Sequence, residues 1–257
     1  MATFSAQPIP RPVPPPPLLA ARAALFLDFD GTLAPLAEQP EAVQVRPELP
    51  ALLAAVGRRL GGALAIITGR RLEDIDRRLA PFAFSGAGLH GAQLRPAANG
   101  EARLQWSTSV QPLVEVLRRR FGADSRIVIE DKQVCVALHY RQAPERAQEC
   151  RDVMHALARP PDFELMAGKM VIEARPHGTH KGRAVLALLD HAPFSGRRPV
   201  FVGDDVTDED GFAAAARLGG HGIKVGLGFT LAAYRIERPE DIFGWLQASL
   251  EAGSTGL

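Results

Sequence analysis

Short apolar runs alternate with longer amphipathic stretches along most of the chain after Arg22. Runs of consecutive apolar residues are typical of strands buried on both faces of a sheet, and they occur at Ala23–Leu27, Ala63–Ile67, Pro199–Val202 and Ile223–Val225. Leucines and alanines at three- and four-residue spacing predict helices at Glu48–Leu60, Leu72–Leu79, Lys181–His191, Asp210–Leu218 and Glu240–Leu250. This alternation predicts an α/β fold with a parallel sheet flanked by helices.

The pattern changes in the middle of the chain, between about Trp106 and His177. The predicted helices of this part are Gln111–Phe121 and Glu145–Ala158, and its predicted strands are Ile127–Glu130, Val134–Tyr140 and Lys169–Ala174. Alternating polar and apolar positions in these strands favour an antiparallel α+β unit inserted into the parallel domain. We therefore expect a core made of residues 22–106 and 178–257, with a second domain at residues 107–177.

The chain begins with a proline-rich segment, which runs from Pro8 to Pro17 as PIPRPVPPPP. Successive prolines remove amide donors and favour extended polyproline II conformation. We expect residues 1–21 to form a disordered leader. A proline-binding partner domain could read such a segment, but an inert leader is the simpler interpretation, and protein partners stay unknown.

Charge is nearly balanced, with 30 basic and 29 acidic residues among 257. Such a balance offers little attraction for nucleic acid or an acidic membrane, so we expect neither as a partner. The sequence shows no secretory signal, and no apolar run approaches the roughly 20 residues of a membrane span. Cys135 and Cys150 are too few for a disulfide framework. These features predict a cytoplasmic protein.

Two carboxylates separated by one residue follow the first predicted strand, in the segment Asp28-Phe29-Asp30-Gly31-Thr32. In an extended chain this spacing points both carboxylates to one side and Phe29 to the other. Gly31 permits the tight turn by which the backbone leaves the sheet beside a ligand. Ligands of open parallel sheets bind beyond the carboxyl ends of the strands, so this segment is a candidate site.

Polar groups also follow or precede the other predicted strands. Thr68 comes after the second strand, Lys181 begins the helix that leads to the third, and Asp204 and Asp208 follow the third. Each group by itself fits a solvated turn or helix start as well as a site. Together, the oxygens of Asp28, Asp204 and Asp208 form a set that suits Mg²⁺, which prefers carboxylates and retained waters.

These residues, in this order, resemble the four motifs of the haloacid dehalogenase superfamily of phosphotransferases. The resemblance spans the chain apart from its leader and implies a Rossmann-like hydrolase core with an inserted α+β cap domain. It makes Asp28 the nucleophile and Asp30 the general acid and base, while Thr68 and Lys181 hold the phosphoryl oxygens. It also implies that Asp28, the Asp30 carbonyl and Asp204 bind Mg²⁺.

The implied reaction has clear physical requirements. A phosphate monoester repels an attacking carboxylate, so Mg²⁺ and Lys181 have to offset the charge of the transition state. Attack by Asp28 would form an aspartyl-phosphate. Asp30 would give a proton to the leaving sugar oxygen and then act as the base that activates water.

Further segments resemble the trehalose-6-phosphate phosphatases, in which the cap closes on the sugar. They are Leu89-His90-Gly91-Ala92, Ile129-Glu130-Asp131-Lys132, Leu138-His139-Tyr140-Arg141, Gly168-Lys169-Met170-Val171-Ile172-Glu173-Ala174-Arg175-Pro176 and Gly203-Asp204-Asp205-Val206-Thr207-Asp208-Glu209. The resemblance implies hydrolysis of trehalose 6-phosphate to trehalose and phosphate in trehalose biosynthesis. One departure is Gln93, at a position where the family commonly has an acidic residue.

The same resemblance implies a set of substrate-binding residues. They are Glu130, Lys132 and Glu173 for the sugar, Arg70, Arg141 and Lys169 for the phosphate, and His90 as a further substrate-binding residue. Carboxylates accept hydrogen bonds from sugar hydroxyls and a lysine donates to their oxygens, so the mixture suits a neutral disaccharide with one phosphate. Considered without the resemblance, Glu130, Lys132 and Glu173 also fit solvent-facing positions of the predicted strands.

Other functions stay open on the sequence alone. The core motifs do not choose among sugars, so a phosphatase for sucrose phosphate or a glycosyl-phosphoglycerate is the nearest alternative. A non-catalytic sugar-phosphate sensor belongs to another class, and the intact Asp28, Asp30 and Lys181 argue against it. A phosphomutase would return the phosphoryl group to the substrate rather than to water.

Overall fold

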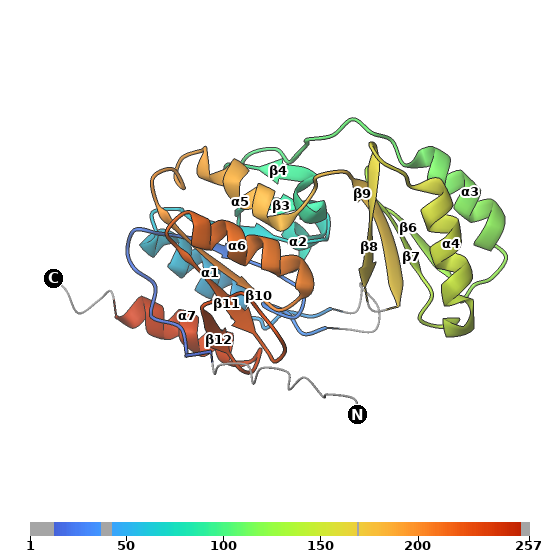
Figure 1. Ribbon diagram of the computed structural model, residues 1–257. Coiled ribbons are helices and arrows are strands. Elements are labelled where there is room, and N and C mark those ends of the chain that lie inside the picture. The colour runs from blue at the N-terminus through green and yellow to red at the C-terminus, as the bar shows by residue number, and fades with distance from the viewer. Residues whose placement is uncertain (1–12, 37–42, 169, 253–257) are drawn as a thin grey trace, which may run out of the picture.

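The computed structural model describes residues 13–36, 43–168 and 170–252 of the chain. Its larger sheet has eight strands, and a smaller sheet of four strands lies beside it (Figure 1). The larger sheet has the order β12 (Tyr234–Ile236), β11 (His221–Val225), β10 (Arg198–Gly203), β1 (Ala23–Leu27), β2 (Leu64–Ile67), β3 (Ser85–Gly88), β4 (Gln93–Arg95) and β5 (Arg103–Leu104).

Six neighbouring strands of the larger sheet, from β12 to β3, run parallel, and β4 and β5 continue it antiparallel. All residues of β1 and β2 are buried, because helices cover both faces of the sheet. This burial explains why both strands are continuously apolar in sequence. The predicted α/β class and its four predicted strands are confirmed.

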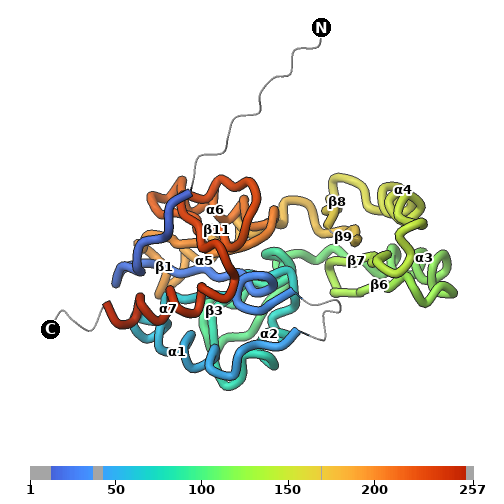
Figure 2. Tube along the Cα trace, turned by 90° about the horizontal axis from the view of Figure 1, so that it is seen from below, coloured from blue at the N-terminus to red at the C-terminus, as the bar shows by residue number. Residues whose placement is uncertain are grey.

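Five helices surround the larger sheet, and all five were predicted to within two residues at each end. They are α1 (Leu49–Arg59), α2 (Leu72–Leu79), α5 (Lys181–Leu189), α6 (Glu209–Arg217) and α7 (Asp241–Glu251). Helices α5 and α6 pack together on one face of the sheet, and α1 and α7 pack together on the other (Figures 1 and 2).

The smaller sheet and two helices form the inserted α+β unit, which is called the cap below. Its antiparallel strands have the order β6 (Val128–Asp131), β7 (Val136–His139), β9 (Val171–Pro176) and β8 (Phe163–Gly168). Its helices are α3 (Gln111–Phe121) and α4 (Ala147–Leu157). The buried side chains of Leu117, Phe121, Leu138 and Met154 belong to a hydrophobic cluster separate from that of the core.

One small apolar cluster joins the cap to the core. Leu89 and Ala92 follow β3 in the core, and they pack against Val134 and Cys135 from the turn between β6 and β7 of the cap. Trp106, in the chain segment that leads into the cap, packs against the same cluster. The base of the cap is therefore fixed to the core by buried side chains as well as by two chain crossings.

The segment before β1 differs from the expected disordered leader. In residues 13–21, Leu19 is buried, its amide donates to Ser249 Oγ (3.2 Å), and the carbonyl of Pro17 accepts from the Trp245 indole (3.0 Å). Pro17 and Leu19 therefore have hydrogen-bond partners on α7, which the expectation of a disordered leader did not include. Residues 1–12 lie outside the described part of the chain.

Candidate active site

The two central strands of the larger sheet bring together residues that are far apart in sequence. Strand β1 lies between β10 and β2, and the chain leaves β1 and β10 toward opposite halves of the sheet. Asp28 directly follows β1, and Asp204 directly follows β10. A crevice of this kind is where open α/β sheets bind ligands. The two carboxylates thus meet at the predicted location.

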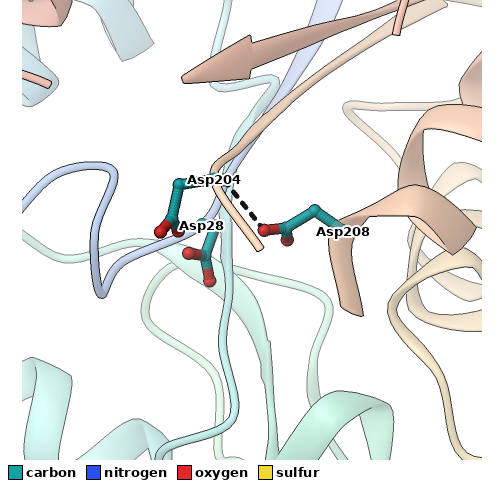
Figure 3. A group of neighbouring side chains, drawn as sticks. All are labelled: Asp28, Asp204 and Asp208. Carbon is teal, nitrogen blue, oxygen red and sulfur yellow. Dashed lines mark hydrogen bonds between the residues drawn. The ribbon is translucent and has the colours of Figure 1, made fainter. Parts of the chain in front are cut away.

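Lys181 links two buried carboxylates at this edge. Its ammonium group, on the first residue of α5, donates to Asp28 Oδ1 (2.7 Å) and to Asp208 Oδ1 (2.6 Å). The other oxygen of Asp208 accepts from the amide of Asp204 (3.0 Å; Figure 3). It also accepts from the amide of Asp205 (2.9 Å). Asp208 therefore fixes both the lysine and the loop that carries Asp204.

The site has room and oxygen donors for a cation. Oxygens of Asp28, Asp204 and Asp208 all lie within 4.8 Å of one another. Gly31 has a φ of +80°, and a Cβ at this position would overlap the carboxylate of Asp204. The glycine thus leaves the space that this carboxylate occupies. Three carboxylates beside the single charge of Lys181 fit a divalent cation with oxygen ligands.

The protonation equilibria reflect this crowding of negative charge. Burial and the charge of Asp208 raise the pKa of Asp28 well above its usual value, despite the opposing charge of Lys181. Burial and Asp208 likewise raise the pKa of Asp204 to about 6. Burial opposes the charged form of Lys181, but Asp208 and Asp28 outweigh it and raise the pKa of the lysine. A bound cation would favour the ionised carboxylates.

Asp30 is held by an arginine rather than by Lys181. Arg70 Nε donates to Asp30 Oδ2 (2.7 Å), and Arg70 Nη2 donates to Asp30 Oδ1 (2.8 Å). Arg70 was predicted to contact the substrate phosphate, whereas in the structure its guanidinium group binds this carboxylate. Thr68 is fully buried, and its hydroxyl accepts from the amide of Arg70 (3.1 Å).

Two cavities meet at Asp30. The larger one, of about 810 Å³, is lined by Asp28, Asp30, His90, Lys181 and Asp204 of the core and by Arg141 and Arg175 of the cap. The smaller one, of about 360 Å³, is lined by Asp30, Gly69, Arg70, Asp74, Arg77 and Arg78 of the core and by Glu130, Lys132 and His139 of the cap. Asp30 therefore faces both spaces, one beside Lys181 and one beside the polar side chains of the cap.

Charged side chains of the cap form one connected cluster. Lys132 Nζ donates to Glu173 Oε2 (2.8 Å) and lies 3.5 Å from Glu130 Oε2, which is 3.0 Å from His139 Nε2. Burial alone would raise the pKa of Glu130, but the hydrogen bond with His139 and the charge of Lys132 lower it to about 2. Burial is also outweighed at Lys132, whose pKa is raised by Glu173 and Glu130.

His90 connects this cluster to the core. Its Nε2 lies 3.7 Å from Glu173 Oε1, and its side chain is buried. Burial lowers the pKa of His90 well below its usual value, and the nearby charges of Lys181 and Lys132 act in the same direction. The structure therefore groups His90, Glu130, Lys132 and Glu173. Arg141 is exposed at the larger cavity, and Lys169 lies outside the described residues.

Gln93, where the sequence departs from the pattern it resembles, has a local structural role. Its Oε1 accepts from the amide of Leu72 at the start of α2 (2.9 Å), and its Nε2 donates to Glu73 Oε1 (2.7 Å). An amide supplies both the acceptor and the donor that these contacts need.

Two basic residues near the site were not found by sequence reasoning. Arg175 lines the larger cavity and pairs with Glu164 (2.8 Å). Lys224 is buried and donates to the backbone carbonyl of Asp204. Arg175 shares the largely buried strand β9 with Glu173, and Lys224 lies between apolar residues of β11. A charged residue in a largely buried strand is the signal that could have identified them.

Comparisons with known proteins identify relatives of this chain. Residues 26–229 match the family model of trehalose-phosphatase. A "Probable trehalose-phosphate phosphatase" of Sinorhizobium fredii is 46% identical over 205 residues, which cover 79% of this chain and 77% of that protein. A trehalose-6-phosphate phosphatase of Escherichia coli is 38% identical over 245 residues, which cover 92% and 90% of the two chains.

Solved structures show the same fold. The crystal structure of a trehalose-6-phosphate phosphatase related protein aligns with a TM-score of 0.74 at 26% identity, covering 91% of this chain and 99% of the other. Phosphatases and hydrolases of the haloacid dehalogenase superfamily share the architecture as well. On the extent of these matches, the chain belongs to the trehalose-phosphatase family.

Proposed function

We propose that this protein is a magnesium-dependent phosphatase that hydrolyses trehalose 6-phosphate to trehalose and inorganic phosphate. The observation that carries the proposal is the position of Asp28, which is held by Lys181 and lies beside Asp204 in the crevice between β1 and β10. A carboxylate held next to a cation site and a buried ammonium group suits nucleophilic attack on phosphorus. The activities named for the similar proteins support the choice of substrate.

The residues that would hold Mg²⁺ follow from their remaining contacts. Lys181 occupies one oxygen of Asp28, and the Asp204 carboxylate accepts a long hydrogen bond from the Thr32 hydroxyl (3.4 Å). These two carboxylates and the carbonyl of Asp30 are the proposed ligands, while Asp208 positions the loop. When bound, the ion offsets negative charge on the phosphoryl oxygens.

The proposed chemistry uses two carboxylates in sequence. In the first half-reaction an oxygen of Asp28 bonds to phosphorus, the phosphorus–sugar oxygen bond breaks, and the sugar oxygen receives a proton from Asp30. In the second half-reaction water bonds to phosphorus and gives a proton to Asp30, and the bond from phosphorus to Asp28 breaks. Lys181 stays charged and balances the phosphoryl oxygens throughout.

The two cavities support an arrangement in which the phosphate group and the sugar occupy different spaces. Lys181 lines the larger cavity, which suits the phosphate, and Glu130 and Lys132 line the smaller one, which suits hydroxyl groups. Asp30 lines both cavities, so an ester oxygen between them would lie next to the proposed proton donor. Glu173 and His90 complete the proposed sugar site, and Arg141 and Lys169 are proposed to attract the phosphate.

Phosphate release from a panel of sugar phosphates, with and without Mg²⁺, tests the proposal. We expect trehalose 6-phosphate to be hydrolysed with the highest kcat/KM and only when Mg²⁺ is present. Faster hydrolysis of sucrose phosphate or a glycosyl-phosphoglycerate would identify that compound, in place of trehalose 6-phosphate, as the substrate. Binding without turnover would indicate a sensor, and an isomerised sugar phosphate would indicate a mutase.

A further inference from the structure

Arg70 and Asp30 form a two-point contact that brings a rigid guanidinium plane against the proposed acid and base. Both nitrogen–oxygen distances are short, 2.7 and 2.8 Å, and the two bonds use both oxygens of the carboxylate. We propose that Arg70 is a positioning residue, which holds the carboxyl group of Asp30 in the orientation needed for proton transfer to and from the substrate. The proposal rests on the function proposed above for Asp30.

Contacts other than those with Asp30 also hold Arg70 in place. Its amide donates to Thr68 Oγ1 (3.1 Å), and its carbonyl accepts from the amide of Leu89 (2.9 Å). The guanidinium carbon lies 6.0 Å from the centre of the Phe29 ring, and the side chain is 14% exposed. An arginine that is already ordered loses little further side-chain entropy when it binds a carboxylate.

The carboxyl group of Asp30 stays accessible while it is held. Its side chain is 30% exposed and lines both cavities, so it reaches the space proposed for the ester oxygen. Each carboxylate oxygen has two lone pairs, and the two bonds from Arg70 use one on each. Rotation of the carboxyl group would break at least one of these bonds. Arg70 thus fixes the direction of the remaining lone pairs.

Leaving-group dependence separates this role from phosphate binding. The sugar alkoxide of trehalose 6-phosphate needs a proton to depart, whereas 4-nitrophenolate departs without one. For Arg70→Gln we expect kcat for trehalose 6-phosphate to fall by about 100-fold, a loss typical of impaired acid–base catalysis, with KM within about twofold. The pre-steady-state burst of 4-nitrophenolate from 4-nitrophenyl phosphate should change by less than about threefold.

Two further variants sharpen the expected result. Arg70→Lys keeps a positive charge but cannot bind a carboxylate at two points, so we expect kcat to stay at least about tenfold below the parent value. Arg71→Gln removes the neighbouring guanidinium group, whose Nε lies 3.4 Å from Glu73 Oε2, and should keep parent activity. Thermal unfolding of each variant confirms that it is folded.

The outcome that overturns the inference is a loss shared by both substrates. If Arg70→Gln raises KM for both and weakens inhibition by inorganic phosphate, the arginine binds the phosphoryl group instead. Asp30→Asn, measured on the same two substrates, tests the underlying assignment separately. If Asp30→Asn loses activity equally on trehalose 6-phosphate and on 4-nitrophenyl phosphate, Asp30 is not the acid. If Asp30→Asn loses activity mainly on trehalose 6-phosphate but Arg70→Gln does not, only the positioning role of Arg70 is refuted. The double variant should be no slower than Asp30→Asn.

Discussion

Lys181 Nζ lies 2.7 Å from Asp28 Oδ1, and both side chains are almost completely buried at the carboxyl edge of the sheet. The lysine comes from the start of α5, so this contact joins residues separated by 153 positions. Burial of an ionised group is costly without a partner of opposite charge. The contact therefore combines a structural role with the proposed chemical one.

Replacement of Lys181 by methionine should affect both roles. The change leaves Asp28 and Asp208 buried without their shared partner, and we expect the free energy of unfolding to fall by about 3 kcal/mol and turnover to fall by at least about 100-fold. Urea denaturation and phosphate release measure the two effects. Arg217→Met, at an exposed position of α6, is the control. Unchanged stability and turnover would contradict the arrangement.

Asp28→Asn should abolish turnover while the protein stays folded. Asparagine has the same shape and can still accept a hydrogen bond from Lys181, but its amide is a poor nucleophile. We expect kcat to fall by at least about 1000-fold and acid-labile phosphate on the protein to disappear. Asp152→Asn, an exposed residue of α4, should retain both signals. Near-normal turnover in Asp28→Asn would exclude this nucleophile.

Mg²⁺ should stabilise the folded protein through the same carboxylates. At about 100 times its dissociation constant, a ligand that binds only the folded state adds about 2.7 kcal/mol, which raises Tm by about 5 °C or more for a chain of this size. Asp204→Asn should remove the shift. Gly31→Ala should also remove it, because the added Cβ overlaps the Asp204 carboxylate. If Mg²⁺ raises the Tm of both variants as much as that of the parent, the ion binds at another site.

Lys132→Met should impair recognition of the sugar but not the chemistry on phosphorus. Lys132 lies in the smaller cavity, where it contacts Glu173 and Glu130. We expect KM for trehalose 6-phosphate to rise at least about tenfold, the cost of one charge-assisted hydrogen bond, while KM for 4-nitrophenyl phosphate changes by less than about twofold. Arg119→Met, at an exposed position on α3, serves as the control. Equal increases for both substrates would assign Lys132 to the phosphate.

His90 should make stability depend on pH. Its pKa in the folded protein is lowered by burial, so below about pH 6.5 the unfolded chain binds a proton that the folded protein does not. The free energy of unfolding should therefore fall as pH decreases from 6.5, with a limiting slope of about 1.4 kcal/mol per pH unit from this residue. Removal of the imidazole should remove that contribution.

Urea denaturation at several pH values between about 7.5 and 5.5 measures the effect. His90→Asn is the suitable variant, because His90 has a φ of +56° and asparagine adopts this conformation readily. The difference in unfolding free energy between parent and variant should change with pH in the stated direction. Parallel pH profiles would show that His90 is not held neutral.

The parts of the fold that were predicted from sequence are those with a strong local pattern. Strand β1 is a continuous apolar run, strand β10 contains one at Pro199–Val202, and the helix α2 was predicted at its observed bounds. Strand β3, with the sequence SGAG, has no such pattern. It was missed because its glycines serve close packing: a Cβ on Gly86 would meet the carbonyl of Ile66 at 2.6 Å.

The candidate site likewise contains residues whose position could be predicted from the sequence and one whose partner could not. Asp28 and Asp204 could be placed together because each follows a central strand, and parallel strands end at one edge. The partner of Arg70 could not be predicted in this way. Its position next to Thr68 suits a phosphate contact and a carboxylate contact equally. The tertiary structure, in which the guanidinium group lies 6.0 Å from the centre of the Phe29 ring, places it against Asp30.

The cap leaves the core after β5 and returns just before α5, and its hydrophobic cluster is separate from that of the core. Lys181, Asp28 and Asp204 all belong to the core, whereas Glu130 and Lys132 belong to the cap. A lineage could therefore exchange or remodel one inserted unit and acquire a different sugar preference, while the machinery that cleaves the ester is inherited intact. The Leu89–Val134 contact sets a condition on such grafting, since any replacement has to present an apolar turn at its base.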